Sequence, residues 1–173
     1  MIIWINGTFG VGKSAVAQAL KKIMNDSFEL INSDEEYIKM IRKDENLAFG
    51  GAFPQNNENF IKIFRKLIQD KINNKKNLIV DMAITEKKSK DELINYFKNK
   101  NDKFFHFVCT ADDENIKNRI MSDKNRDKSN AIYYVNINKK FLDKNFKNAI
   151  LIDTNNKNPE DIASEIYTII KKH

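Results

Sequence analysis

The sequence has few of the residues that form disulfides and metal sites. It contains one cysteine, Cys109, and two histidines, His106 and His173, among 173 residues. A disulfide within the chain is therefore impossible. Cys109 and His106 lie in one apolar run, where burial in the core explains them better than metal ligation does. We do not expect a structural zinc site, which takes four cysteine or histidine ligands.

Long apolar runs are also absent. No stretch approaches the roughly 20 apolar residues that a membrane-spanning helix needs. Residues 1–5 are apolar, but the segment is short, lacks a basic lead-in and continues into glycine-rich sequence, unlike a signal peptide. The chain has 41% hydrophobic and 31% charged residues, and it shows no repeat or proline-rich linker. We therefore expect a single globular domain over residues 1–173, located in the cytoplasm.

Clusters of positive charge are missing as well, although the net charge is +6 and the pI about 9.2. The lysines occur as pairs spread along the chain, such as Lys21-Lys22, Lys75-Lys76 and Lys171-Lys172. This pattern is typical of a solvated surface, so we do not expect a nucleic-acid partner. A nucleic-acid end kinase is the alternative, and salt-dependent binding of an oligonucleotide would indicate it.

Apolar runs typical of strands alternate with stretches of helical periodicity. This is the pattern of an α/β domain built on a parallel sheet. The expected strands cover residues 2–5, 28–32, 78–80, 104–109 and 150–152. The expected helices cover residues 13–24, 36–42, 57–72, 112–121 and 159–171, with another through residues 93–97. Residues 122–129 form a charged, apolar-poor segment. Five strands with helices between them suit a three-layer sandwich.

One glycine-rich motif lies between the first strand and the first helix. Residues 7–14 read Gly7-Thr8-Phe9-Gly10-Val11-Gly12-Lys13-Ser14 and match the phosphate-binding pattern G-x-x-x-x-G-K-[ST]. The glycines allow the backbone N–H groups to converge on a β-phosphate. The expected helix begins at Lys13, with Ala15 in its first turn, and its positive N-terminal end would also attract the phosphate. Lys13 would bind the β- and γ-phosphates, and the Ser14 hydroxyl would bind magnesium.

The context of this motif strengthens the prediction. Three of the five glycines in the chain lie inside it. An apolar strand precedes it and a good helix start follows it, as the fold requires. We therefore expect the chain to bind ATP with magnesium.

Two aspartates, Asp34 and Asp81, follow expected strands. In open parallel sheets, ligands lie beyond the carboxyl ends of the strands. We favour Asp34 as the base, or the carboxylate that orients the acceptor, and Asp81 as a magnesium group that acts through water. The alternatives are helix N-capping for Asp34 and solvation at a strand end for Asp81.

Arginine is scarce, with only Arg42, Arg65, Arg119 and Arg126. Arg119 lies just before the polar segment that follows the fourth strand and its helix, and Arg126 lies within it. A lid over about residues 122–130, together with these two arginines, would close over ATP and stabilise the transferring charge, with surface salt bridges as the alternative. Arg42 and Arg65 are weaker candidates for binding an anionic acceptor.

The sequence resembles the small P-loop kinases of the adenylate kinase and shikimate kinase type. Residues 2–14 are particularly similar to the start of the tunicamycin-resistance proteins. The resemblance continues through residues 78–82, 105–107, 118–120 and 152–155, so it covers most of the chain. The phosphate loop is its one specific motif.

This resemblance implies a sheet of order 2-3-1-4-5, helices on both faces, a small lid and ATP as the phosphoryl donor. It implies that Arg119 lies against the adenine or the phosphates, and that the loop containing Thr154 lies near the adenine. It places acceptor binding within about residues 35–73. Ser33-Asp34-Glu35 supplies only one aspartate of the pattern typical of shikimate kinases, which argues against shikimate as the acceptor.

We therefore expect a phosphotransferase that moves the γ-phosphate of ATP to a small molecule, such as a nucleoside-like compound or an antibiotic. One alternative is a nucleoside monophosphate kinase, in which Arg42 and Arg65 would hold the acceptor phosphate. Another is a protein that binds ATP without catalysis, to sequester a drug or to act as a switch. A GTPase is disfavoured because residues 156–159 lack the aspartate of an Asn-Lys-x-Asp motif. The oligomeric state is not predicted.

Overall fold

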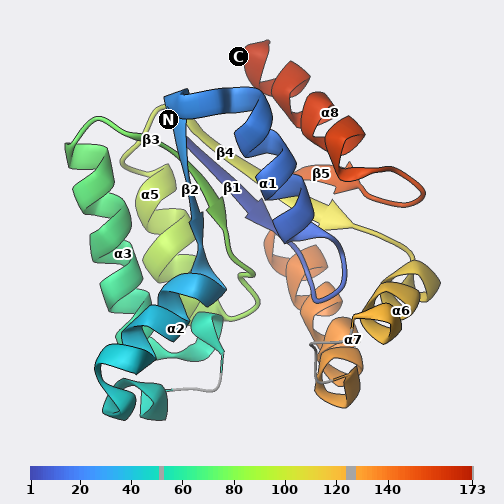
Figure 1. Ribbon diagram of the computed structural model, residues 1–173, viewed down its shortest axis with the longest axis horizontal. Helices are drawn as coiled ribbons and strands as arrows, with labels where there is room; N and C mark the ends of the chain where they lie inside the picture. The colour runs from blue at the N-terminus through green and yellow to red at the C-terminus, as the bar shows by residue number, and fades with distance from the viewer. Residues whose placement is uncertain (51–52, 124–127, 173) are drawn as a thin grey trace.

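The computed structural model describes residues 1–50, 53–123 and 128–172. Its centre is a five-stranded parallel sheet of order β2-β3-β1-β4-β5 (Figure 1). The strands are β1 (Ile2–Asn6), β2 (Phe28–Asn32), β3 (Asn77–Asp81), β4 (Phe104–Thr110) and β5 (Ile150–Asp153). Register pairs such as Ile5 with Asp81, and Asn32 with Asp81, bring the carboxyl ends of β1, β2 and β3 together. The expected α/β class and strand order are confirmed.

Helices cover both faces of the sheet (Figure 1). One face carries α1 (Lys13–Met24) and α8 (Pro159–Lys171), and α6 (Asp113–Ser122) follows β4. The other face carries α2 (Ser33–Lys43), α3 (Glu58–Asn73), the run from Lys87 to Lys98 and α7 (Lys128–Asn145). That run consists of α4 (Lys87–Ser89), the π-helix η4 (Lys90–Asn95) and α5 (Tyr96–Lys98). Short 3-10 turns are η1 (Asn25–Ser27), η2 (Glu45–Gly50) and η3 (Pro54–Asn56).

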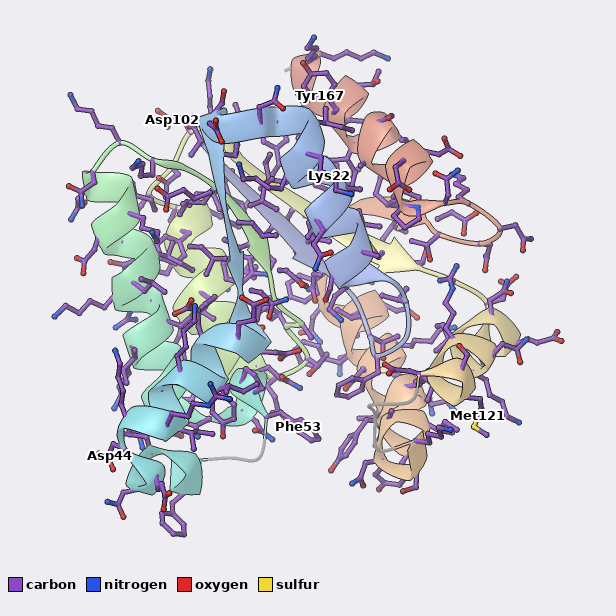
Figure 2. All side chains as sticks on the ribbon, viewed as in Figure 1. Lys22, Asp44, Phe53, Asp102, Met121 and Tyr167 are labelled. Carbon is purple, nitrogen blue, oxygen red and sulfur yellow. The ribbon has the colours of Figure 1, made fainter. Side chains whose placement is uncertain are left out.

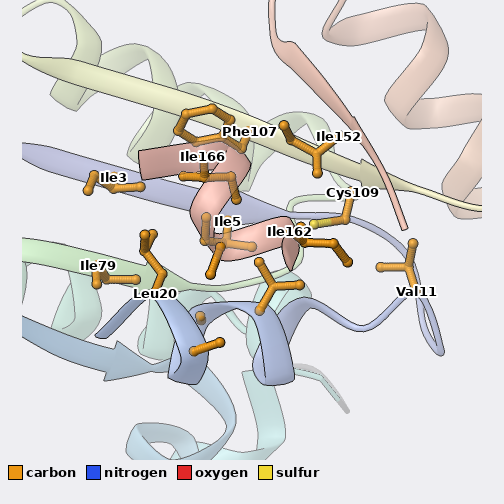
Figure 3. Packing of buried hydrophobic residues seen from close by; sticks show 14 of the residues in the cluster. Ile3, Ile5, Val11, Leu20, Ile79, Phe107, Cys109, Ile152, Ile162 and Ile166 are labelled. Atoms are coloured by element: carbon orange, nitrogen blue, oxygen red, sulfur yellow. The ribbon is translucent and has the colours of Figure 1, made fainter. Parts of the chain in front are cut away.

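Alternating side chains of the strands form two cores, one on each face. Ile3 and Ile5 of β1 pack in a cluster with Leu20 of α1 and with Ile162 and Ile166 of α8 (Figure 3). On the other face the core is built by Trp4 of β1, by α3 and by residues of η4, α5 and α7. The predicted apolar stripe of residues 57–72 is confirmed as core, because its members Phe60, Ile61, Phe64 and Ile68 are buried.

Cys109 lies in the first of these cores, as expected. Burial raises the pKa of its thiol to about 12, so the thiol stays protonated and unreactive at neutral pH. No helix within residues 1–50, 53–123 and 128–172 is long and apolar enough to cross a membrane.

The helix α7 is the main element that the sequence analysis missed. Its buried residues Ala131, Val135, Asn138 and Leu142 have helical spacing, but one of them is an asparagine. Ile132 and Ile137 point outward and are partly exposed, which obscures the amphipathic pattern. Residues 128–130 of the expected lid segment therefore belong to this helix, while residues 124–127 lie outside the described part of the chain.

The helix α2 begins at Ser33, three residues before the expected start at residue 36. The side chain of Asn32 explains the earlier start, because its Oδ1 accepts hydrogen bonds from the backbone N–H groups of Asp34 and Glu35, both at 3.0 Å. Asn32 is therefore the N-cap, a position that asparagine favours. The capping role considered for Asp34 belongs to Asn32 instead.

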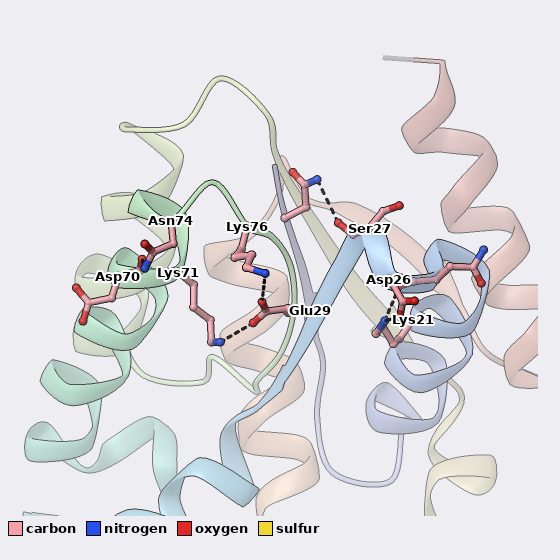
Figure 4. Close-up of polar contacts among 10 residues, drawn as sticks. Lys21, Asp26, Ser27, Glu29, Asp70, Lys71, Asn74 and Lys76 are labelled. Atoms are coloured by element: carbon pink, nitrogen blue, oxygen red, sulfur yellow. Dashed lines mark hydrogen bonds and ion pairs between the residues drawn. The ribbon is translucent and has the colours of Figure 1, made fainter.

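Several surface lysines are engaged in local ion pairs. The Glu29 carboxylate on β2 pairs with Lys71 and with Lys76, whose Nζ lies 3.1 Å from Glu29 Oε1 (Figure 4). These two hydrogen bonds lower the pKa of Glu29. Asn77 also donates to the Ser27 carbonyl at 3.2 Å. These lysines lie on the surface at the edge of the sheet, as the dispersed lysine pairs in the sequence predict.

Candidate active site at the carboxyl ends of the strands

The loop between β1 and α1 folds back tightly on itself. Gly7, Gly10 and Gly12 all have positive φ angles, of 148°, 71° and 99°. A Cβ on Gly7 would lie 2.7 Å from Val11 Cγ1 and 2.9 Å from the Cys109 carbonyl oxygen. The backbone conformation and the close packing against β4 therefore both require glycine at position 7.

A buried asparagine, Asn6, fixes the start of this loop. Its Oδ1 accepts hydrogen bonds from the N–H of Gly7 at 2.7 Å and from the N–H of Ile84 at 2.8 Å. The side chain thus ties the first residue of the loop to the segment that follows β3. The sequence analysis did not select Asn6, because an asparagine before a glycine is a common turn residue.

The loop encloses one side of a pocket of about 200 Å³. Gly10, Gly12, Lys13, Ser14, Ala15, Arg119 and Asp123 line it. Lys13 Nζ donates to the Thr8 carbonyl oxygen at 3.1 Å, which holds the ammonium group over the loop. The first turn of α1 contains no acidic residue and no side-chain cap, so its N–H groups and positive end are available to an anion.

Asp81 lies at the end of β3, beside the start of α1. It is 3% exposed, and its Oδ2 accepts a hydrogen bond from Asn32 Nδ2 at 2.7 Å. Burial raises the pKa of Asp81. The positive charge of Lys13, together with hydrogen bonds from Ser14 and Asn32, opposes this rise, and the charge of Asp34 adds to it. These couplings place the carboxylate of Asp81 next to the first turn of α1.

The structure therefore brings four of the predicted residues into one group: Lys13, Ser14, Asp34 and Asp81. Ser14 and Asp81 offer the oxygen ligands that magnesium prefers. The residues fit a magnesium–triphosphate, because the pocket combines the ammonium group of Lys13 with an uncapped helix start, and the carboxylate of Asp81 lies beside that helix start. Thr8 Oγ1 adds a buried hydroxyl in this loop that has no hydrogen-bond partner among the described residues.

We expect Asp81→Asn to keep or increase the stability of the protein at neutral pH. Since burial raises the pKa of Asp81, the ionised carboxylate costs free energy in the folded state. The stability difference between the variant and the wild type should shrink as the pH falls through the raised pKa and Asp81 becomes protonated. Thermal unfolding between pH 7 and pH 4 measures this, with Asp70→Asn on the exposed face of α3 as the control. A variant that is less stable at pH 7 would contradict it.

Arg119 and Thr154 form a second polar group at the loop. Arg119 Nη1 donates to the Val11 carbonyl and to Thr154 Oγ1, both at 3.1 Å, and its Nη2 donates to the Thr154 carbonyl at 2.6 Å. The Thr154 hydroxyl is buried and bonds the carbonyl oxygens of Val11 and Thr110. Arg119 therefore clamps α6 and the segment after β5 onto the phosphate loop while it lines the pocket.

We expect Arg119→Ala to weaken both folding and use of ATP. The loss of charged hydrogen bonds to buried carbonyl oxygens should lower the free energy of unfolding by about 1–3 kcal/mol. We also expect kcat/KM for ATP to fall about 10- to 100-fold, and Arg119→Lys to restore little, because an ammonium group lacks the planar fork. Chemical denaturation and steady-state kinetics measure these effects. Full activity in both variants would show that Arg119 takes no part in the use of ATP.

The other arginines differ in position. Arg65 on α3 pairs with Glu92, and its guanidinium lies 5.0 Å from the ring centre of Tyr96. It is thus engaged with the η4–α5 run, away from the phosphate loop. Arg42 is exposed in the last turn of α2. Arg126, the second arginine of the expected lid, lies outside the described residues.

An aromatic cluster that the sequence analysis missed lies across from the phosphate loop. The ring of Phe53 lies 5.7 Å from that of Phe9 in the loop and 5.7 Å from that of Tyr134 on α7. Figure 2 shows Phe53 between the α2 side and the α7 side of the molecule. Phe53 belongs to the expected acceptor segment, and nothing in its local sequence signals contact with a helix eighty residues later.

Comparison with known proteins agrees with this architecture. No curated protein matches the sequence. Among solved structures, the tunicamycin resistance protein of Deinococcus radiodurans has a TM-score of 0.73 and 20% identity, with 98% of this chain and 95% of that chain covered. A sugar kinase from Janibacter sp. has a TM-score of 0.70 and 12% identity, with 98% and 94% covered.

A shikimate kinase from Acinetobacter baumannii, solved with shikimate, has a TM-score of 0.66 and 19% identity over 99% of this chain and 93% of that chain. A family model described as "AAA domain" matches residues 2–133, which is more than half of the sequence. The chain therefore belongs to the AAA domain family and has the fold of the small P-loop kinases.

Proposed function

We propose that this protein is a magnesium-dependent kinase that transfers the γ-phosphate of ATP to a small molecule. The observation that carries the proposal is the grouping of Lys13, Ser14 and Asp81 at the start of α1, with Asp34 coupled to Asp81. Lys13 and the N–H groups of the loop would hold the β- and γ-phosphates. Ser14 and Asp81 would hold magnesium, which neutralises the charge that develops on the transferred group.

Asp34 would act on the acceptor. It is exposed at the first turn of α2, which begins where β2 ends. Its carboxylate is free to accept the proton of an acceptor hydroxyl as that oxygen bonds to phosphorus. Asn32 supports this arrangement from both sides, because it caps α2 through Oδ1 and bonds Asp81 through Nδ2.

The acceptor would bind between the α2–η3 side and α7. Phe9, Phe53 and Tyr134 give this region an aromatic surface, which favours a compound with a planar ring, such as a nucleoside-like molecule or an antibiotic. The similarity to a tunicamycin resistance protein, to a sugar kinase and to a shikimate kinase supports a small hydroxylated acceptor. The lid role of residues 122–130 and of Arg126 remains a prediction from the sequence, as does the cytoplasmic location.

The alternatives are less well supported. A nucleoside monophosphate kinase would need arginines at the acceptor phosphate, and Arg65 is instead engaged by Glu92 and Tyr96. A protein that only binds ATP would need no proton acceptor for an acceptor hydroxyl, the role that we propose for Asp34.

The magnesium dependence of the Asp81→Asn variant tests the proposed role of the metal group. We expect activity at fixed ATP to fall about 10- to 100-fold and to recover in part at high magnesium, because the carboxylate helps to hold the ion. Asp70→Asn should behave like the wild type. A magnesium titration of turnover measures both variants. An unchanged magnesium requirement in Asp81→Asn would remove Asp81 from the metal site.

A further inference from the structure

A second pocket lies at the opposite end of the sheet, near the start of β4 and β5. Its volume is about 410 Å³, a size common for small-molecule sites. It is bounded by the run from Lys90 to Lys98, by residues 104–106 of β4 and by residues 144–150, which connect α7 with β5. Leu93 and Phe97 on one side and Phe146 on the other pack in the same core, so a shared apolar floor supports both walls.

The charge of this pocket has one sign. Four lysines line it: Lys90, Lys98, Lys144 and Lys147. Among the described residues that line it, none is acidic. No ion pair is recorded for these lysines within the described ranges, and Lys90 instead lies 5.5 Å from the ring centre of Phe146. This arrangement contrasts with Lys71 and Lys76, which share the carboxylate of Glu29. Unpaired cations held around one concavity favour an anion.

The floor of the pocket also offers a hydrogen-bond donor, His106. Asn6 Nδ2 lies 3.1 Å from His106 Nε2. The orientation of the Asn6 amide is fixed, because its Oδ1 already accepts from two backbone N–H groups. Nδ2 can only donate, so His106 Nε2 must be the acceptor. In a neutral ring the proton is then on Nδ1, which has no hydrogen-bond partner among the described residues. The ring itself packs edge-on against Phe146, with the ring centres 4.7 Å apart.

The ring of His106 is neutral at physiological pH. Burial, and to a lesser extent the charge of Lys98, lowers its pKa to about 3. His106 therefore contributes a directed N–H donor, while the surrounding lysines supply the positive charge. Pairing fixed donors with mobile cations is how proteins recognise phosphate groups.

We propose that this pocket, formed by Lys90, Lys98, Lys144 and Lys147 around His106, binds a small phosphorylated molecule at a site separate from the phosphate loop. A concave pocket with an apolar floor suits a compact phosphate ester better than an extended nucleic-acid backbone, which needs a continuous basic groove. The Asn6 side chain connects this site to Gly7, the first residue of the phosphate loop, through His106.

Binding of pyrophosphate without magnesium tests the proposal. The experiment uses the Lys13→Ala variant, in which binding of pyrophosphate at the phosphate loop is weakened. The chain has two histidines, so the signals that disappear in His106→Gln are those of His106. We expect pyrophosphate to shift the ¹⁵N signals of His106 and to bind with a stoichiometry near one by calorimetry. The double variant Lys98→Glu/Lys144→Glu should lose the shift and bind at least about tenfold more weakly.

The matched control is Lys66→Glu/Lys172→Glu, which makes the same charge change at two exposed lysines on α3 and at the end of α8. We expect it to keep the His106 shift and most of the affinity. An equal loss in both double variants, or no His106 shift in the Lys13→Ala protein, would overturn the proposal. Tighter binding of a single-stranded oligonucleotide than of pyrophosphate through the same lysines would also overturn it. If the pocket variant fails to fold, Lys98→Gln/Lys144→Gln replaces it, with Lys66→Gln/Lys172→Gln as its control and the same expected loss of the His106 shift.

Discussion

Replacing Lys13 with alanine is expected to reduce phosphoryl transfer by about 100- to 1,000-fold, because the site loses its main positive charge on the transferred phosphate. The effect should fall mainly on kcat, with weaker binding of the triphosphate as a second consequence. Folding should be largely preserved, since the recorded hydrogen bond of the Lys13 ammonium is to the Thr8 carbonyl. Steady-state ADP release and ATP binding by calorimetry measure the two effects.

The matched control for this variant is Lys22→Ala, which removes an exposed lysine from the same helix. It should retain full activity and full ATP affinity. The two variants change the net charge equally, so a difference between them reports the position of the charge. Normal turnover by Lys13→Ala would refute the proposed mechanism at the phosphate loop.

Replacing Asp34 with asparagine should lower kcat by about 100-fold or more, while the KM for ATP changes little. The amide keeps the size and position of the side chain but cannot accept the proton of the acceptor hydroxyl. The N-cap of α2 should survive, because Asn32 and not Asp34 supplies it. The loss should therefore come without a change in stability.

Glu35→Gln is the control for Asp34→Asn. Glu35 is the next residue, is exposed and lies in the same first turn of α2. Its replacement removes one negative charge at almost the same place and should leave kcat unchanged. An unchanged kcat in Asp34→Asn would show that Asp34 is not the base. Equal losses of kcat in Asp34→Asn and Glu35→Gln would indicate a general effect of the negative charge.

The parts of the fold that local patterns specify were predictable from the sequence. The phosphate-loop motif requires glycines at positions 7 and 12, and both have positive φ angles in the structure, as does Gly10 between them. The central strands β1 and β3 carry continuous buried apolar runs, because the middle of the sheet is covered on both faces. Pro159 marks the start of α8, as the preference of proline for the first helical turn predicts.

What could not be predicted depends on contacts between distant residues. Asn6 and Asn32 are ordinary turn or cap residues in the sequence, and their bonds to Ile84 and Asp81 exist only because the sheet brings those segments together. Phe53 meets Tyr134 for the same reason. The helix α7 escaped prediction because Asn138 interrupts its buried stripe while Ile132 and Ile137 face outward.

The proposed location of the acceptor site rests on these distant contacts. The proposed site combines an aromatic surface from Phe9, Phe53 and Tyr134 with the exposed carboxylate of Asp34. The acceptor segment contains no motif of its own, and similar folds accept different substrates. In the proposed function, the side chains of this region, rather than the fold, would select the acceptor.

The most direct test of the central claim is transfer of labelled γ-phosphate from ATP with magnesium across a panel of acceptors. The panel would contain nucleosides, nucleoside monophosphates, shikimate, sugar acids, and aminoglycoside, phenicol and uridine-type antibiotics. We predict that one class with a planar ring and a free hydroxyl becomes labelled by the wild type and not by Lys13→Ala. ATP binding without transfer to any of these acceptors would contradict the assignment as a small-molecule kinase and favour a protein that only binds ATP.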